Sequence, residues 1–322
     1  MLGKIKGLGS YLPSKVLSNK DLEEMVETSD EWIVERTGIR ERRIADPYKE
    51  TVSAMACSAA KAAIEDAGID PLDIDLIILA STTSNMVVPC GACVVQREVG
   101  ADNAMCFDLN SACTGFLTAY NTAQSFIEAG HAKTALVVGS ECTSNYVDWN
   151  DRGTCILFGD GAGAAVLCAE ESDEPNRFIL KAAGKKGDCL FAENLKQRKD
   201  AEELLPNTFF LMDGKEVFKF AVTEVPAIIK ELCDKYDINM EDVDLFVLHQ
   251  ANKRIIEGVS KRLKVPLERF PMTIEHTGNT SSASIPTLLT KLKKEGKIKA
   301  GTKIITSGFG AGLTWGANYI EF

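Results

Sequence analysis

This chain of 322 residues lacks two features that would place a protein on nucleic acid or in a membrane. Its 36 Lys and Arg are outnumbered by 46 Asp and Glu, which gives a formal net charge of −10. Without a basic excess no nucleic-acid partner is expected, and an acidic partner must dock on a local basic patch. No segment reaches the ~18 uninterrupted apolar residues of a membrane span, and residues 1–8 do not resemble a signal peptide. We therefore expect a cytoplasmic protein without membrane association.

Histidine and tryptophan are also scarce, with three residues of each, whereas there are ten cysteines. Many cysteines in a long chain without an extracellular signature indicate reduced thiols rather than a disulfide framework. A single Cys-x-x-Cys motif, Cys90 to Cys93, has neither a second pair nor a histidine-rich neighbourhood. A non-enzymatic zinc or redox module at this motif is thus a distant alternative, and we expect no metal site and no cofactor.

An internal repeat organises the chain. Residues 69–80 reappear as residues 238–249, at a shift of 169 positions from 80 to 249. The same shift places residues 110–113 on residues 279–282, and each copy is followed by an amphipathic helix and then by a β-rich stretch. Self-similarity of this kind indicates two copies of one structural unit.

The two copies predict an α/β protein with two similar halves, which we place at residues 1–170 and 171–322. Helices that alternate with buried apolar strands favour mostly parallel sheets covered by helices. The halves are expected to pack around a pseudo-twofold axis, with the active site where equivalent turns meet.

A candidate nucleophile, Cys113, lies directly before a long apolar-periodic segment of the first half. Backbone N–H groups and the positive end of a helix dipole favour the thiolate, so we expect a lowered pKa for this thiol. The second half supplies His249 at a predicted strand end and Asn279 at a predicted helix start. Taken singly, these residues have ordinary roles as an apolar Cys, a satisfied histidine and a helix N-cap. Together at strand and helix ends, they are predicted to converge on one site.

The motifs around these residues resemble the 3-oxoacyl-[acyl-carrier-protein] synthase III family, the condensing enzymes that initiate bacterial fatty-acid synthesis. The resemblance spans nearly the whole chain and rests on residues 29–33, 36–39, 110–116, 151–154, 158–163, 249–252, 278–281 and 308–316. It implies the thiolase fold, with five layers in the order α-β-α-β-α. Related degradative thiolases carry a second Cys near the C-terminus. The glycine-rich loop that begins at Phe309 has none, so a degradative enzyme is disfavoured.

The resemblance implies an acyltransferase with two half-reactions. Cys113 would attack the thioester of an acyl-CoA primer and hold the acyl group. Malonyl-acyl carrier protein would then lose its carboxylate, and the enolate, which accepts hydrogen bonds from His249 and Asn279, would attack the acyl group. Small residues permit close approach of a substrate, and the backbone N–H groups expected in the oxyanion hole are those of Cys113, Gly310, Ala311 and Gly312.

The resemblance also implies a nucleotide site. The CoA adenine would lie between Trp32 and Arg152, with Arg36 near the phosphates, since an indole and a guanidinium make flat, stackable faces. Without the motifs, these residues would be interpreted as a packing tryptophan and two solvated charges.

A basic patch suits the acidic carrier protein. A helix is predicted over residues 251–263, and it would present basic side chains beside those of the preceding helix. The residues expected to contact the carrier protein are Lys219, Arg254, Lys261 and Arg262. The alternative is an ordinary solvated helix face.

The primer pocket is expected to involve Val88, Thr143 and Phe158. In the family, the residue at the position of Val88 reaches across a homodimer interface into the partner's acyl pocket, and an aromatic side chain there limits primers to very short chains. Because Val88 and Thr143 are small, we expect primers longer or more branched than acetyl, and a homodimer.

Three further points stay as expectations. A related condensing enzyme of secondary metabolism, with another acceptor, would keep the same three residues. Residues 159–163 suggest a dinucleotide fingerprint, but residues 164–168 predict a strand instead of the required helix, so close backbone packing explains these glycines better. The charged residues 184–206 lack apolar periodicity and are expected to form a mobile loop near the substrate entrance.

Overall fold

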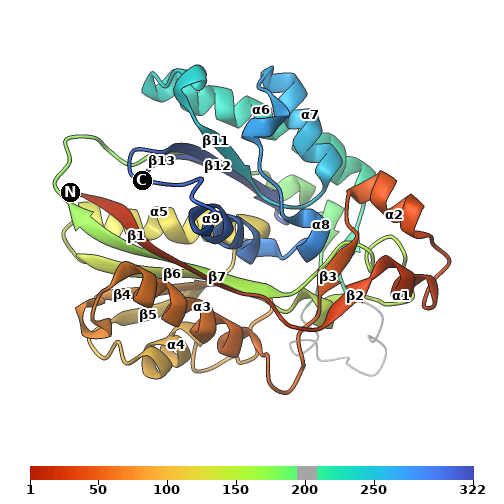
Figure 1. Ribbon diagram of the computed structural model, residues 1–322, viewed down its shortest axis with the longest axis horizontal. Helices are drawn as coiled ribbons and strands as arrows, with labels where there is room; N and C mark the ends of the chain where they lie inside the picture. Colours follow the sequence, from red (N-terminus) through yellow and green to blue (C-terminus); the bar gives the residue numbers. More distant parts are fainter. Residues whose placement is uncertain (194–208) are drawn as a thin grey trace.

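The computed structural model describes residues 1–193 and 209–322, whose strands form two large sheets (Figure 1). The first sheet has the order β1-β7-β6-β4-β5. Its strands are β1 (Leu2–Tyr11), β4 (Leu76–Ala80), β5 (Met105–Leu109), β6 (Thr134–Glu141) and β7 (Gly161–Glu170). Strand β4 is parallel to both β5 and β6, whereas β7 is antiparallel to both β1 and β6.

The second sheet repeats this arrangement in the order β11-β12-β13-β8. Its strands are β8 (Arg177–Ala182), β11 (Leu245–Leu248), β12 (Lys303–Gly310) and β13 (Thr314–Glu321). Strand β11 is parallel to β12, and β13 is antiparallel to β12 and β8. Both sheets are mixed, so the prediction of mostly parallel sheets is wrong. A parallel return needs a long crossover, usually a helix, and no α-helix separates β6 from β7 or β12 from β13.

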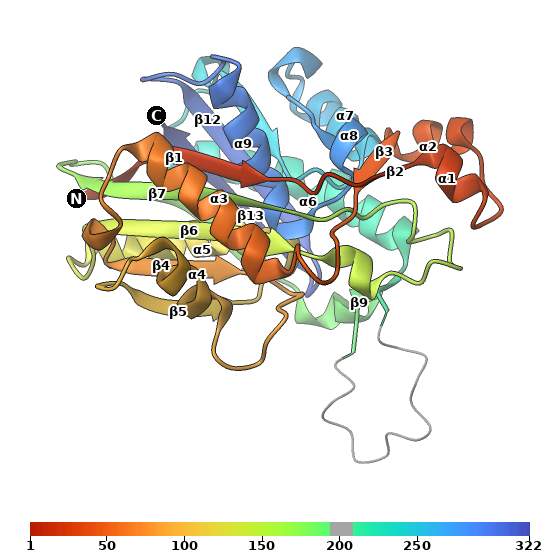
Figure 2. The same ribbon diagram turned by 60° about the horizontal axis from the view of Figure 1, so that its bottom comes forward.

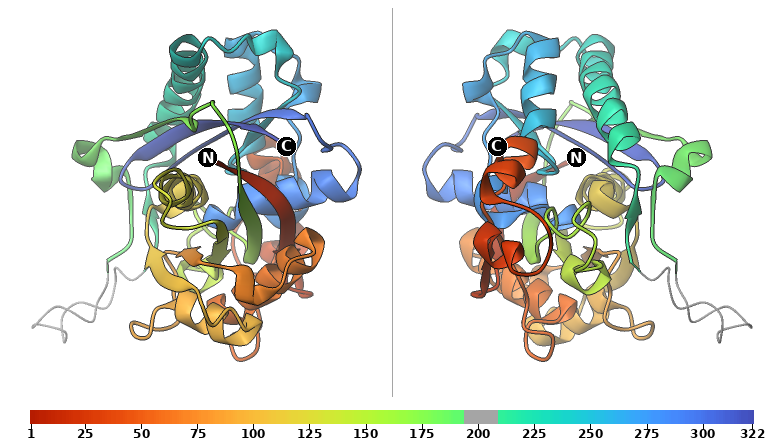
Figure 3. Two further views of the ribbon diagram at one scale, coloured as in Figure 1. Left: turned by 90° about the vertical axis from the view of Figure 1, so that its left-hand side faces the viewer. Right: turned by 90° about the vertical axis from the view of Figure 1, so that its right-hand side faces the viewer.

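Helices lie on both outer faces of the sheets and between them (Figure 2). They are α3 (Val52–Ala67), α4 (Gly91–Val99), α5 (Gly115–Glu128), α6 (Gly214–Tyr236), α7 (Lys253–Leu263) and α9 (Ser284–Lys294). Helices α3 and α4 cover the first sheet, and α6 and α7 cover the second. Helices α5 and α9 share one apolar core with both sheets. The end-on views of Figure 3 show these layers stacked on one another.

Equivalent turns of the two halves have the same local geometry. Asp75 and Asp244, which directly precede β4 and β11, each accept a hydrogen bond from the first backbone N–H of the neighbouring parallel strand, β6 or β12. Ala112 and Ser281, which the repeat shift superimposes, both have positive φ, 47° and 48°. The turns that contain Ala112 and Ser281 both belong to the candidate active site.

Smaller elements complete the described chain. They are β2 (Val16–Ser18), α1 (Asn19–Glu23), α2 (Asp30–Thr37), β3 (Glu41–Arg43), β9 (Leu190–Phe191), β10 (Leu211–Met212) and α8 (Ile274–Thr277). Of the predicted loop, the first part is a 3₁₀ helix (Gly184–Cys189) followed by β9, which pairs with β10. Its remainder, residues 194–206, lies outside the described residues. No helix in the part of the chain that the structure describes has the length and apolar character to cross a membrane.

Candidate active site

One cavity, with a volume of about 470 Å³, brings residues of both halves together. Cys113 from the first half and His249 and Asn279 from the second all line it. Each of these residues lies at the end of a strand or in a turn, as expected for chemistry built on α/β layers. The structure therefore places the three predicted side chains around one space.

Cys113 lies in a 3₁₀ turn (Ala112–Thr114) between β5 and α5. The turn packs against the end of β12, where a Cβ on Gly310 would lie only 2.7 Å from the Cys113 backbone nitrogen. A larger residue at position 310 would displace the nucleophile, so glycine is required for this close approach. The hydroxyls of Thr114 and Thr314, 2.9 Å apart, tie the same turn to β13.

Burial governs the ionisation of the Cys113 thiol. It raises the pKa to about 12; a hydrogen bond with Ser281 lowers the pKa, and the negative charge of Glu141 raises it. The expected lowering of this pKa is therefore wrong, because loss of water outweighs the helix terminus. The thiol is protonated at neutral pH, and its proton must be removed when the sulfur attacks a thioester.

His249 directly follows β11, and its backbone N–H donates to Ser307 O of β12 at 2.8 Å. Its Nδ1 lies 2.7 Å from Ser284 Oγ, which also accepts the backbone N–H of Gln250 at 3.5 Å. This favours a hydroxyl that donates to Nδ1, with the ring proton on Nε2. Burial lowers the pKa of His249 to about 3, so the ring is a neutral hydrogen-bond donor.

Asn279 is held by its backbone and by its side chain. Its N–H donates to Leu157 O at 2.8 Å, and its carbonyl accepts from Gly159 N–H at 3.0 Å. Its Oδ1 accepts the backbone N–H of Ser281 at 2.9 Å, which is the capping role common for asparagine. Because the amide oxygen is engaged, the NH₂ group is the end that can donate to a substrate.

The predicted oxyanion-hole positions divide into two pairs. Cys113 and Gly310 line the cavity, whereas Ala311 and Gly312 do not. Ala311 uses its carbonyl in the turn between β12 and β13, where it accepts the Thr314 hydroxyl at 3.2 Å. Two of the four positions thus border the cavity, and their role in an oxyanion hole stays a prediction.

The predicted nucleotide residues form an aromatic and cationic cluster. The guanidinium carbons of Arg152 and Arg36 lie 5.3 Å and 5.7 Å from the centre of the Trp32 ring. Trp32 and Arg36 line the cavity, and Arg152 donates to Glu27 O at 3.0 Å. These distances suit cation–π contacts, so the cluster offers flat faces and positive charge together.

The predicted basic patch lies on two packed helices. The helix predicted over residues 251–263 is confirmed as α7, which begins at Lys253, and the preceding helix is α6. The side chains of the patch, all exposed, are Lys219, Arg254, Lys261 and Arg262. Arg254 also lines the cavity and covers the Phe218 ring at 5.6 Å. The patch therefore borders the cavity.

Of the three predicted primer residues, Phe158 alone lines the cavity in this chain. Phe158 lines the cavity and stacks on Phe210, with ring centres 5.1 Å apart. Thr143 is fully buried outside the cavity wall, and its hydroxyl donates to Gly159 O at 2.6 Å. Val88, before α4, is 81% exposed. Its predicted role depends on a partner subunit and stays a prediction.

Sequence reasoning missed two apolar walls of the cavity and the support behind its polar groups. Leu190 of β9 and Met212 of β10 line the cavity, although Leu190 lies inside and Met212 shortly after the charged segment 184–206, which has no periodic signal. Ser281 and Ser284 contact the predicted site residues, but isolated serines carry no signature that separates them from ordinary helix-start residues.

The Cys-x-x-Cys motif and the glycine motif at residues 159–163 both lie outside the predicted catalytic residues. Cys90 and Cys93 lie at the start of α4 with their sulfur atoms 3.4 Å apart, and all ten cysteines are free thiols. Within residues 1–193 and 209–322, no group of three or more His, Cys, Asp or Glu is arranged to hold a metal ion. The strand predicted after the glycine motif is confirmed as β7, and a Cβ on Gly159 would lie 2.2 Å from Thr277 O.

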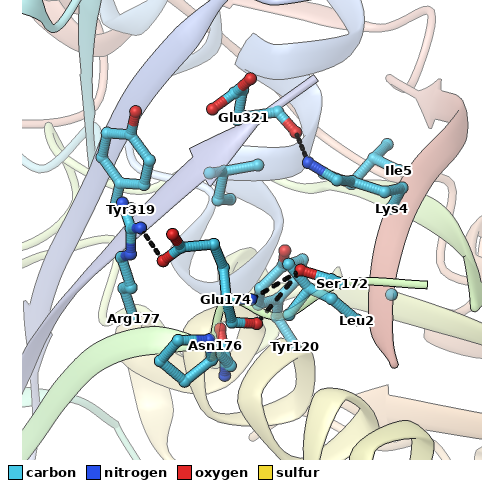
Figure 4. Close-up of a pocket in the computed structure, with 13 residues that line it drawn as sticks. Leu2, Lys4, Ile5, Tyr120, Ser172, Glu174, Asn176, Arg177, Tyr319 and Glu321 are labelled. Atoms are coloured by element: carbon cyan, nitrogen blue, oxygen red, sulfur yellow. Dashed lines mark hydrogen bonds and ion pairs between the residues drawn. The ribbon is translucent and has the colours of Figure 1, made fainter. Parts of the chain in front are cut away.

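A second cavity, of about 210 Å³, lies beside β1 and β13 (Figure 4). Tyr120 and the ion pair between Glu174 and Arg177 belong to its wall. None of the predicted site residues lines it. The three predicted catalytic residues therefore line the first cavity and not this one.

Comparison with known proteins identifies the family of this chain. Family models described as 3-oxoacyl-[acyl-carrier-protein (ACP)] synthase III and its C-terminal part match residues 107–187 and 233–322. The chain is 46% identical over 321 residues to the beta-ketoacyl-[acyl-carrier-protein] synthase III of Clostridium acetobutylicum, covering 99% of this chain and 98% of that protein.

Two crystal structures show the same architecture. The 3-oxoacyl-[acyl-carrier-protein] synthase III from Aquifex aeolicus superposes with a TM-score of 0.92 at 43% identity, over 99% of this chain and 100% of that one. The priming beta-ketosynthase from the R1128 polyketide biosynthetic pathway gives a TM-score of 0.94 at 37% identity, over 100% and 96%. By sequence and by fold, this chain belongs to the 3-oxoacyl-[acyl-carrier-protein] synthase III family.

Proposed function

We propose that this chain condenses an acyl-CoA primer with malonyl-acyl carrier protein, releasing CoA and CO₂, and so initiates type II fatty-acid synthesis. The observation that carries this function is the meeting of Cys113, His249 and Asn279 in one cavity. Family membership supplies the reaction class, and the geometry of the cavity supports the roles that we propose for its residues.

The first half-reaction is acyl transfer. The Cys113 sulfur attacks the thioester carbonyl, the bond to the CoA sulfur breaks, and the acyl group stays on Cys113. Backbone N–H groups of Cys113 and Gly310, which both line the cavity, would donate to the negative oxygen of the tetrahedral intermediate. The cluster around Trp32 would hold the nucleotide at the other end of the cavity.

The second half-reaction is decarboxylative condensation. His249 Nε2–H and the Asn279 NH₂ group donate to the thioester oxygen of the malonyl group, so that charge developing after loss of CO₂ is stabilised. Such donors contribute about 2.7–4 kcal/mol each in comparable sites. The enolate carbon then attacks the acyl carbonyl, and Cys113 is released as the leaving group. No step requires a cofactor.

The carrier protein would dock on the basic patch of α6 and α7. The patch borders the cavity through Arg254, so a carrier bound there can direct its malonyl arm toward Cys113. A local positive surface steers an acidic partner even when the net charge is negative.

The layered arrangement supports the thiolase fold, with halves at residues 1–170 and 171–322 related by a pseudo-twofold axis. A homodimer that uses the β5 edge would cover exposed apolar surface. Met105 of β5 is 50% exposed, and Val87 and Val88 are each 81% exposed. Exposed sheet edges and apolar patches are typical of protein contacts. We also propose that the protein is located in the cytoplasm.

The second candidate function is condensation of the primer with an acceptor other than malonyl-acyl carrier protein. The similarity to a polyketide priming ketosynthase keeps open a primer reaction in secondary metabolism. The 46% identity over 321 residues to a beta-ketoacyl-[acyl-carrier-protein] synthase III favours malonyl-acyl carrier protein instead.

The decisive experiment separates the half-reactions. The purified chain is mixed with acyl-CoAs, and the mass of the intact protein is measured; malonyl-acyl carrier protein is then added and the product identified. We expect an acyl adduct on Cys113 and a 3-oxoacyl carrier protein. An adduct without product from this acceptor would favour the second candidate, and no adduct would refute the condensing function.

A further inference from the structure

A buried carboxylate lies behind the proposed nucleophile. Glu141 ends β6 and is fully buried. Its Oε2 accepts the Thr83 hydroxyl at 2.7 Å and the hydroxyl and backbone N–H of Thr82, both at 3.1 Å. Its Oε1 accepts the hydroxyls of Ser282 and Ser281 at 2.8 Å and 3.1 Å. Glu141 therefore connects the segment after β4 with the turn of the second half that is equivalent to the Cys113 turn.

These donors are neutral. Among the ion pairs of the described chain, none joins Glu141 to a Lys, Arg or His. Burial raises the pKa of Glu141, and its hydrogen bonds oppose that rise. A buried carboxyl group without a neighbouring cation is a ready proton acceptor.

Ser281 joins this acceptor to the nucleophile. Its hydroxyl donates to Glu141 at 3.1 Å, and its side chain lies beside the Cys113 thiol because the turn Ser281–Ala283 packs against the turn Ala112–Thr114. The backbone of Ser281 is held in place as well, because its N–H donates to Asn279 Oδ1 at 2.9 Å. One hydroxyl thus lies between a thiol that must lose a proton and a carboxylate that can accept one.

The charges at the site favour transfer of the Cys113 thiol proton to Glu141 over loss of that proton to solvent. Ionised Glu141 raises the pKa of Cys113, and also those of Cys142 and Tyr146. If Cys113 lost its proton to solvent, the buried site would hold two negative charges. If the proton moves to Glu141, the site holds one negative charge throughout, and the repulsion disappears as the thiolate forms.

We propose that Glu141 is a positioning residue that takes the proton of Cys113 through Ser281. The S–H bond breaks as the proton passes to Ser281 Oγ, and the proton of that hydroxyl passes to Glu141 Oε1. The sulfur meanwhile bonds to the thioester carbon, and the bond to the CoA sulfur breaks. CoA leaves as a thiolate and is protonated from water, while Glu141 returns its proton to water. The net reaction is transfer of the acyl group from CoA to Cys113. This inference rests on the proposed function.

The test compares two variants with a matched control. Glu141→Gln removes the acceptor, and Ser281→Ala removes the bridge but keeps Glu141 and its bond from Ser282. The control is Asp160→Asn, another fully buried carboxylate, which accepts the hydroxyl and N–H of Ser144 instead. Single-turnover acylation by acetyl-CoA is followed by intact mass across a pH range, with melting temperatures as a check on folding.

We expect both variants to acylate about a hundredfold more slowly at neutral pH, a common loss for a missing base. The deficit should shrink as the pH rises, because hydroxide then removes the thiol proton directly. Once acylated by long incubation, both variants should condense with malonyl-acyl carrier protein at a rate within about threefold of the unmodified protein, because no thiol proton remains.

Three outcomes would overturn the relay. They are normal acylation of both variants at neutral pH, a loss that is equal at every pH and in both half-reactions, and the same pH-dependent loss in Asp160→Asn. If Glu141→Gln fails to fold, the acylation rates of Ser281→Ala alone decide whether the relay operates. Failure of the unmodified protein to form any acyl adduct would instead refute the proposed function.

Discussion

The Nδ1 atom of His249 and the Oγ atom of Ser284 lie 2.7 Å apart, so the first residue of α9 orients the imidazole that follows β11. This contact connects the turn of the second half to the donor that is proposed to stabilise the enolate. Because a histidine can carry its proton on either nitrogen, the partner of Nδ1 decides what Nε2 offers to a substrate.

Ser284→Ala is therefore expected to slow condensation about fivefold, the equivalent of about 1 kcal/mol for one hydrogen bond, and to leave acylation unchanged. The measurement is the rate of product formation from pre-acylated enzyme. Ser260→Ala is the control, since Ser260 is a buried serine whose hydroxyl donates to Val265 O. Equal slowing of acylation would mean that Ser284 supports the fold rather than the tautomer.

Cys113→Ser should abolish acyl-enzyme formation, because a hydroxyl lacks the nucleophilicity of a thiolate. His249→Ala and Asn279→Ala should still form the adduct but condense about a hundred to a thousand times more slowly, as expected for a lost oxyanion donor. Intact mass after mixing with acetyl-CoA reports the adduct. A normal adduct on Cys113→Ser would refute the assignment of the nucleophile.

Reversal of charge in the basic patch should affect only the reaction with malonyl-acyl carrier protein. Arg254→Glu combined with Lys261→Glu is expected to raise the KM for malonyl-acyl carrier protein about tenfold at low salt, with a smaller effect at high salt. Acylation by acyl-CoA should be nearly unchanged. Lys299→Glu, an exposed charge after α9, provides the control. Loss of both half-reactions would indicate a folding defect or a role in CoA binding.

Val88→Phe is expected to shift primer preference toward acetyl-CoA. Two additional buried methylenes change binding by about 1.6 kcal/mol, so the preference should change about tenfold. Steady-state rates with acetyl-, butyryl-, isobutyryl- and hexanoyl-CoA measure it. Strict acetyl preference that Val88→Phe leaves unaltered would show that other residues close the pocket.

Buried His249 should make folding sensitive to acid. Its pKa is lowered to about 3 in the folded chain by burial, so the unfolded state binds the extra proton below its ordinary pKa of about 6.5. The stability that this neutral ring provides is fully present above about pH 6.5 and is lost as the pH falls toward 3. Between pH 7.5 and pH 5, the unmodified protein should lose about 2 kcal/mol more unfolding free energy than His249→Asn. Urea titrations at the two pH values measure the difference, and equal losses would mean that the folded chain protonates His249 readily.

The sequence by itself determined the repeat, the alternation of helices and strands, and the residue types of the site. Residues 110–113 and 279–282 are related by their spacing alone, and the motifs around Cys113, His249 and Asn279 suffice to place the chain in its family. Helix α7 and strand β7 were equally predictable, because amphipathic periodicity and apolar runs are local properties.

Only the tertiary structure decided the direction of β7 and β13, the raised pKa of Cys113 and the position of Thr143 outside the cavity wall. It also brought Glu141, Ser281 and Ser284 to the site. These properties depend on segments that are distant in the chain: Ser281 lies 140 positions from the carboxylate that it contacts, and the Cys113 thiol loses its water to packing from the other half. Burial and hydrogen bonding between remote segments leave no periodic trace in the sequence, so only the folded chain reveals them.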